Sequence, residues 1–120
     1  MHTAAAPETH HLVSADRLAL MKPGAVIINT ARGSVIDESA LIKTLSEGKI
    51  RAGLDVYEKE PVAKDSPLLA MDNVVLMPHL GSATAAILQA MMERALTNLV
   101  AGLSGKPLPW CENHEVYTEP

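Results

Sequence analysis

Short apolar blocks alternate with polar segments along the first two thirds of the chain, and the blocks have the length of strands. Residues 25–29 begin with an unbroken apolar run that follows Pro23-Gly24, a pattern typical of a strand buried on both faces in a parallel sheet. The stretches 50–56 and 74–77 predict two further short strands. Met1-His2 resembles the end of another strand.

Apolar residues three or four positions apart predict helices between and after these strands. Ser14 caps the first helix, which ends at Pro23-Gly24, and Asp37 caps the second, which ends at Gly48. The third helix, residues 83–103, is the longest. Its apolar stripe consists of Leu88, Met91, Met92, Ala95, Leu96, Leu99, Val100 and Leu103. We expect packing against the chain's own sheet to cover most of this stripe.

The order of these elements predicts an α/β fold. A strand at 25–29, a helix and a strand at 50–56 follow one another within about thirty residues, the length of a βαβ unit. Such a unit crosses over in the right-handed sense, so its two strands are parallel. Residues 58–72 are mainly polar and contain two prolines, which predicts a long loop.

Composition excludes several classes of function. The 120 residues are 48% hydrophobic and carry a net charge of −4 without clustered Lys or Arg, so neither nucleic acid nor an anionic membrane is an expected partner. The single Cys111 cannot form an intrachain disulfide, and the first residues lack the pattern of a signal peptide, which favours the cytoplasm. No apolar run has the length of a membrane span. Residues 105–120 read as a Pro-rich polar tail.

Three side chains with catalytic potential each follow a predicted strand: Arg32, Glu60 and His79. The carboxyl ends of parallel strands share one edge, where α/β proteins hold ligands. Arginine binds a carboxylate through two parallel hydrogen bonds, and an imidazole exchanges a proton near neutral pH. Glu60 is placed to pair with His79. Taken singly, Arg32 is equally well explained as a surface arginine, and the favoured interpretations are solvated loop charges for Glu58 and Glu60 and a structural histidine for His79. The convergence of the three residues favours function.

No metal site is expected. His10 and His11 are adjacent, and the favoured interpretation is exposed loop histidines that turn away from one another. Cys111 and His114 have a spacing compatible with a metal, but two ligands are fewer than the four of a structural zinc site.

Three ordered motifs carry a family resemblance. Lys22–Gly33 reads KPGAVIINTARG, Gly53–Pro61 reads GLDVYEKEP, and Pro78–Thr84 reads PHLGSAT. Together they resemble the signature of the D-isomer-specific 2-hydroxyacid dehydrogenases. The resemblance implies that residues 1–104 are a partial NAD-binding domain: the second half of a Rossmann-like domain, truncated, with a three-layer parallel sheet and flanking helices.

The same resemblance implies a reaction and a cofactor. The reaction is hydride transfer between NAD or NADP and a small 2-keto or 2-hydroxy acid. Its catalytic set is Arg32, Glu60 and His79, and its cofactor contacts are Thr30, Ala31, Arg32, Asp55, His79, Gly81 and Ser82.

The glycines do not complete a dinucleotide site. They lie at positions 24, 33, 48, 53, 81, 102 and 105, and no three have the Gly-x-Gly-x-x-Gly spacing that binds pyrophosphate. We therefore expect little activity from the isolated chain, and apolar surface exposed on the open sheet edge and on the helix 83–103. The alternative is a non-catalytic module. In either case a homo-oligomer, or pairing with a full-length homologue, is expected.

Overall fold

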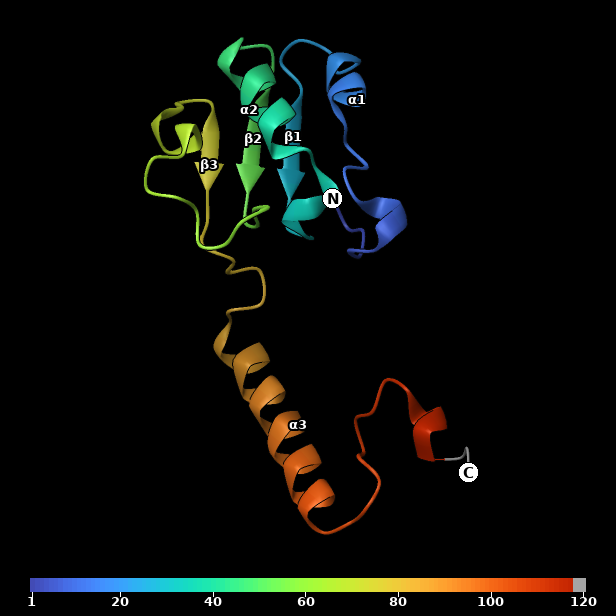
Figure 1. Cartoon of the computed structure of the whole chain (residues 1–120). Coiled ribbons are helices and arrows are strands. Elements are labelled where there is room, and N and C mark those ends of the chain that lie inside the picture. Colours follow the sequence, from blue (N-terminus) through green and yellow to red (C-terminus); the bar gives the residue numbers. More distant parts are fainter. Residues whose placement is uncertain (118–120) are drawn as a thin grey trace. The chain divides into compact units, whose positions relative to one another are not determined.

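A computed structural model describes residues 1–117 of the chain. The chain divides into two compact units, Met1–Gly81 and Ser82–Pro120, which Figure 1 draws in colours that follow the sequence. Each unit is described separately. No helix among the described residues is long and apolar enough to cross a membrane.

A parallel sheet forms the centre of the first unit. Its strands β1 (Val26–Asn29), β2 (Arg51–Leu54) and β3 (Val74–Leu76) lie in sequence order, with β2 in the middle (Figure 1). Both pairings are parallel. The predicted α/β class and strand direction are therefore confirmed. β2 is shorter than the predicted 50–56, because the last cross-strand hydrogen bond to β1 is the one from the Asp55 N–H to the Asn29 carbonyl, although the chain stays buried to Tyr57.

Helices α1 (Ala15–Ala19) and α2 (Glu38–Ser46) are the two α-helices of this unit. The carboxylate of Asp37 accepts a hydrogen bond from the Ala40 amide, which confirms the predicted cap of α2. Ser14 is the N-cap residue of α1, but its side chain makes no cap hydrogen bond. Short 3-10 helices cover Pro7–Thr9, Gly33–Val35 and Pro67–Ala70.

The core lies between these helices and one face of the sheet. It joins Leu18 of α1 and Leu41 of α2 to Ile27 and Leu54 of the strands. On the opposite face, Val26, Ile28 and Val75 are 57%, 58% and 66% exposed. The prediction of a strand buried on both faces is thus wrong for β1, because the helices of this unit share a core with only every second strand residue.

The segment 58–72 is less irregular than its polar composition suggests. Its 3-10 helix Pro67–Ala70 inserts Leu68, which is 1% exposed, into the core. Met1 and His2 do not form a strand, although the amino group of Met1 donates to the Ile28 carbonyl of β1 at 2.6 Å.

The second unit is built on α3 (Ala85–Leu103), which the Thr84 side chain caps by accepting from the Ile87 amide. The second unit by itself buries no residue of α3, and the expected covering of its apolar stripe by the chain's own sheet stays a prediction. The following segment returns to α3: the main chain of Trp110 makes two hydrogen bonds of 3.0 Å with the Asn98 amide. A 3-10 helix covers His114–Tyr117. A domain boundary between residues 104 and 105 stays a prediction.

Candidate active site

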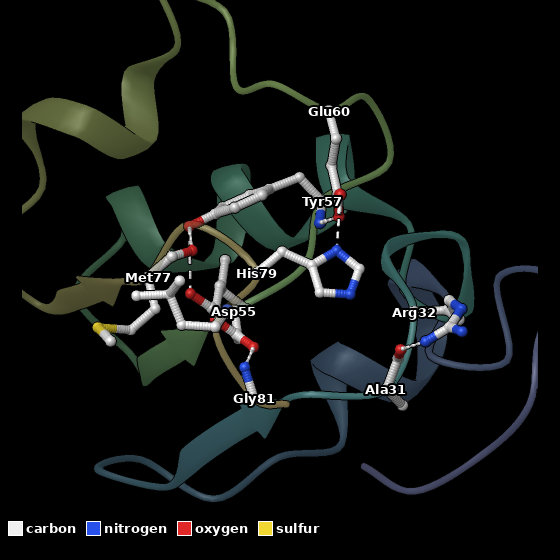
Figure 2. Close-up of polar contacts among 10 residues, drawn as sticks. Ala31, Arg32, Asp55, Tyr57, Glu60, Met77, His79 and Gly81 are labelled. Carbon is white, nitrogen blue, oxygen red and sulfur yellow. Dashed lines mark hydrogen bonds and ion pairs between the residues drawn. The ribbon is translucent and has the colours of Figure 1, made fainter. Parts of the chain in front are cut away.

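The three candidate catalytic side chains come from loops at the carboxyl edge of the sheet (Figure 2). Arg32 follows β1, Glu60 follows β2 and His79 follows β3. Since all three strands run in the same direction, their loops leave the sheet at the same end. This common position is the one predicted from the order of apolar blocks.

Glu60 and His79 form a direct pair. Nδ1 of His79 lies 2.8 Å from Oε2 of Glu60, which confirms the expected contact. The other carboxylate oxygen accepts the main-chain N–H of Tyr57 at 3.1 Å. The hydrogen bond from His79, followed by that from Tyr57, lowers the pKa of Glu60, so Glu60 is an anion near neutral pH and Nδ1 is the donor. The second ring nitrogen, Nε2, is left for another partner.

Hydrogen bonds to Asp55 fix the backbone directly after His79. This aspartate is 6% exposed, and its two oxygens accept the main-chain N–H groups of Leu80 and Gly81, each at 2.7 Å. A side chain at Gly81 would place its Cβ 3.0 Å from the Asp55 carboxylate. His79 itself has a φ of 57°, the left-handed region that residues other than glycine seldom adopt. Asp55 therefore stabilises an unusual backbone next to the candidate acid.

The loop of Arg32 is shaped by Asn29, which is 1% exposed. Its side-chain amide donates to the Arg32 carbonyl at 2.9 Å and accepts from the Ala31 N–H at 3.1 Å. One guanidinium nitrogen of Arg32 donates to the Ala31 carbonyl, and the side chain is otherwise exposed. In the view of Figure 2, Nε2 of His79 points away from Glu60, on the side where Arg32 lies.

Two cavities of similar size adjoin these residues. One, of about 530 Å³, is mainly apolar and is bounded by Glu60 and His79 together with side chains such as Val62, Leu69 and Met77. The other, of about 500 Å³, is lined by Thr30, Ala31 and Arg32 and by residues 2–5. The candidate catalytic residues are thus distributed over two neighbouring openings.

The predicted cofactor contacts differ in how accessible they are to a ligand. Thr30 and Ala31 line the opening beside Arg32, whereas Asp55 is buried and already accepts two backbone donors. Gly81 supplies one of these donors, and Ser82 begins the second unit. Their role in binding a cofactor stays a prediction.

Several contacts were not foreseen from the sequence. Tyr57 is 7% exposed, and its hydroxyl shares its single proton between the carbonyls of Met77 at 2.8 Å and Leu54 at 3.1 Å (Figure 2). Its position directly after Asp55-Val56 indicates a core residue but gives no signal for these hydrogen bonds. His11 forms an ion pair with Glu58, so these are not two independent solvated groups.

The expectation that His10 and His11 turn apart is wrong. Their rings stack with centroids 4.0 Å apart, and His11 has a left-handed φ of 49°. Cys111 donates to the side-chain oxygen of Asn113. Within residues 1–117, no cluster of three His, Cys, Asp or Glu side chains has the geometry of a metal site.

Comparison with known proteins gives a consistent family. Residues 1–81 match the family model described as "D-isomer specific 2-hydroxyacid dehydrogenase, NAD binding domain". Glyoxylate/hydroxypyruvate reductase B of Shigella boydii is 52% identical over 110 residues, covering 91% of this chain and 34% of the relative. The same enzyme of Pectobacterium carotovorum is 51% identical with the same coverage. The chain therefore spans about a third of the length of these curated relatives.

Solved structures agree. The TT0316 protein of Thermus thermophilus is 45% identical with a TM-score of 0.83, over 90% of this chain and 35% of that one. A glyoxylate/hydroxypyruvate reductase of Sinorhizobium meliloti, solved with NADP and malonate, is 40% identical with a TM-score of 0.78, over 86% and 32% of the two chains.

Proposed function

Since the chain belongs to the D-isomer-specific 2-hydroxyacid dehydrogenase family, we propose that it carries the catalytic set of a 2-keto acid reductase that uses NAD or NADP. The observation that supports this most strongly is the Glu60–His79 pair at the carboxyl edge of the sheet, on the same edge as Arg32. The relatives named above suggest glyoxylate and hydroxypyruvate as substrates.

In this proposal Arg32 binds the substrate carboxylate. One of its nitrogens is held by the Ala31 carbonyl, and the remaining N–H groups are free to donate to an anion. A guanidinium that is anchored at one point loses less freedom on binding than an unanchored one. The charge of Arg32 also stabilises negative charge that develops on the substrate carbonyl oxygen during reduction.

His79 supplies the proton. With Nδ1 donating to Glu60, the imidazolium releases the proton of Nε2 to the carbonyl oxygen as a hydride reaches the carbonyl carbon. The reduced nicotinamide, when bound, supplies that hydride. In the reverse direction neutral His79 takes the hydroxyl proton through the same nitrogen. Glu60 holds the ring in this orientation by accepting the Nδ1 proton.

The residues of this chain fit the nicotinamide end of the cofactor. Thr30 and Ala31 line an opening of about 500 Å³ beside Arg32, and Asp55 retains acceptor capacity because each of its oxygens accepts one N–H. The pyrophosphate end has no Gly-x-Gly-x-x-Gly turn in this sequence. The proposal for the isolated chain is therefore very weak cofactor binding and no measurable turnover.

A chimera tests the proposed function. The 110 matched residues are exchanged into the Shigella reductase, which supplies the remaining two thirds of the protein. We expect NADPH-dependent reduction of glyoxylate or hydroxypyruvate, lost when His79 is replaced by Ala. A folded chimera that lacks activity, while the parent reductase is active in the same assay, contradicts the proposal.

A second candidate function is a non-catalytic module that associates with a homologous chain or with itself. The exposed apolar residues Val26, Ile28 and Val75 favour it, because an uncovered apolar sheet face promotes association. Light scattering coupled to gel filtration decides whether the chain is oligomeric. A location in the cytoplasm stays a prediction.

A further inference from the structure

Tyr57 is the residue at which the three candidate catalytic loops meet. It comes two positions after Asp55 and three before Glu60, and it is buried. The predicted catalytic and cofactor residues do not include it. We propose that Tyr57 is a positioning residue that holds Glu60 and His79 in the relative position in which their side chains pair. Its importance for catalysis rests on the function proposed above.

The first contact fixes Glu60. The main-chain N–H of Tyr57 donates to Oε1 of Glu60 at 3.1 Å, while His79 occupies Oε2. A carboxylate whose oxygens are both engaged cannot rotate freely about its last bond. Glu60 is 37% exposed in its side chain, so burial alone does not restrain it. The Tyr57 N–H is therefore the contact within the described residues that orients the second oxygen of this carboxylate.

The second contact fixes the backbone that leads to His79. The Tyr57 hydroxyl donates mainly to the carbonyl of Met77, two residues before His79, at 2.8 Å, and shares the same proton with the carbonyl of Leu54 at the end of β2 at 3.1 Å (Figure 2). The main-chain N–H of Met77 already donates to the Leu54 carbonyl at 2.8 Å, and the Tyr57 side chain adds a contact to the Met77 carbonyl, on the side of this residue that leads to His79. Burial raises the pKa of this hydroxyl, so it remains a protonated donor over the working pH range.

The third contact is steric and concerns the loop of Arg32. A Cβ at Gly33 would lie 1.9 Å from the carbonyl carbon and oxygen of Tyr57, so the two backbones are in direct contact. The Arg32 loop can approach only because position 33 is glycine. Tyr57 consequently touches or bonds to each of the three loops, and its displacement would change their mutual spacing.

The test uses the full chain, and its readout is the ionisation of Glu60 rather than turnover. Tyr57→Phe keeps the ring and the main-chain N–H but removes the hydroxyl. The bonds to His79 and Tyr57 lower the pKa of Glu60 from its ordinary value of 4.5, and carbon NMR of the side-chain carboxyl measures this pKa in the unmutated chain and in the variant. We expect Tyr57→Phe to raise this pKa toward 4.5, because His79 is then held less firmly against the carboxylate.

Asn73→Ala is the matched control. The Asn73 side chain also donates to two carbonyls, those of Leu45 and Ile50, but it lies before β3, at the other end of the sheet. It should lower the melting temperature and leave the Glu60 pKa unchanged. An unchanged Glu60 pKa in Tyr57→Phe, or an equal shift in Asn73→Ala, overturns the positioning role.

A measurement on the unmutated chain keeps the proposal testable if Tyr57→Phe fails to fold. The proton shift of the Tyr57 amide should follow the titration of the Glu60 carboxyl with the same midpoint, because the amide donates directly to it. A Tyr57 amide that is insensitive to this titration overturns the proposal. None of these outcomes depends on turnover, so they separate the role of Tyr57 from the function of the chain.

Discussion

The substitution Asp55→Asn tests most directly whether the Asp55 carboxylate holds the backbone next to His79 in place. The carboxylate accepts two main-chain donors, Leu80 and Gly81, both at 2.7 Å. An asparagine of the same shape offers one acceptor oxygen and turns an N–H₂ group toward the other donor. One short charge-assisted hydrogen bond is thereby lost in an environment where Asp55 is 6% exposed.

The magnitude follows from that loss. A hydrogen bond to a charged group contributes about 1.5–3 kcal/mol, which corresponds to a change of roughly 10- to 150-fold in a local opening equilibrium. Leu80 and Gly81 are the last residues of their unit, so we expect this segment to open locally while the sheet stays folded. Hydrogen exchange of the Leu80 and Gly81 amides should accelerate by roughly 10- to 150-fold in at least one of the two positions.

Two internal controls belong to this assay. The amide of Ala52, which donates to the Asn73 carbonyl, should keep its exchange rate if the opening is local. Asp37→Asn makes the same chemical change at the cap of α2, where the carboxylate accepts from Ala40 and asparagine caps equally well. If Leu80 and Gly81 exchange in Asp55→Asn as slowly as in the unmutated chain, Asp55 does not support the His79 segment.

Further predictions concern packing, pH and binding. Gly33→Ala should lower the free energy of unfolding by about 3 kcal/mol or more in chemical denaturation. Gly53→Ala should lower it far less, because its new Cβ would meet Ile28 at an ordinary 3.7 Å. Equal effects of the two substitutions would contradict the close approach at Gly33. Because folding lowers the pKa of Glu60, this residue contributes to stability above pH 4.5, and the contribution is lost as the pH falls through the lower pKa of the folded state. Glu60→Gln should remove this part of the dependence of unfolding free energy on pH. An unchanged pH dependence in Glu60→Gln would refute this prediction. The isolated chain should be oligomeric or aggregation-prone and bind NADH very weakly, since each ~1.4 kcal/mol of lost phosphate contacts weakens affinity tenfold; micromolar affinity from a monomer would overturn this.

Much of the fold was predictable because local signals agree. The apolar blocks at 25–29, 50–56 and 74–77 indicate strands, and Asp37 marks the start of the intervening helix. A βαβ unit then fixes strand direction, which in turn brings the loops after the strands to one edge. The contact between Glu60 and His79 follows from this chain of reasoning, although the two residues are 19 positions apart.

The remaining features depend on information that a single sequence lacks. Whether Val26 and Ile28 are covered depends on which elements pack on that face, and an apolar run does not specify this. The bond of Tyr57 to Met77 links residues 20 positions apart through the close approach of two loops. A tyrosine directly after a strand suggests only a core residue. The pairing of His11 with Glu58, 47 positions apart, is equally invisible to local patterns.

The central claim is that Glu60 acts in catalysis through His79, and a double-mutant cycle in the chimera tests it most directly. The variants are Glu60→Gln, His79→Gln and the double substitution, and the quantity compared is kcat for glyoxylate reduction with saturating NADPH. If Glu60 acts only through its contact with His79, the double variant is no slower than His79→Gln alone. Losses that multiply, so that the double variant is slower by the product of the two single effects, would show that Glu60 and His79 act independently and would contradict the account.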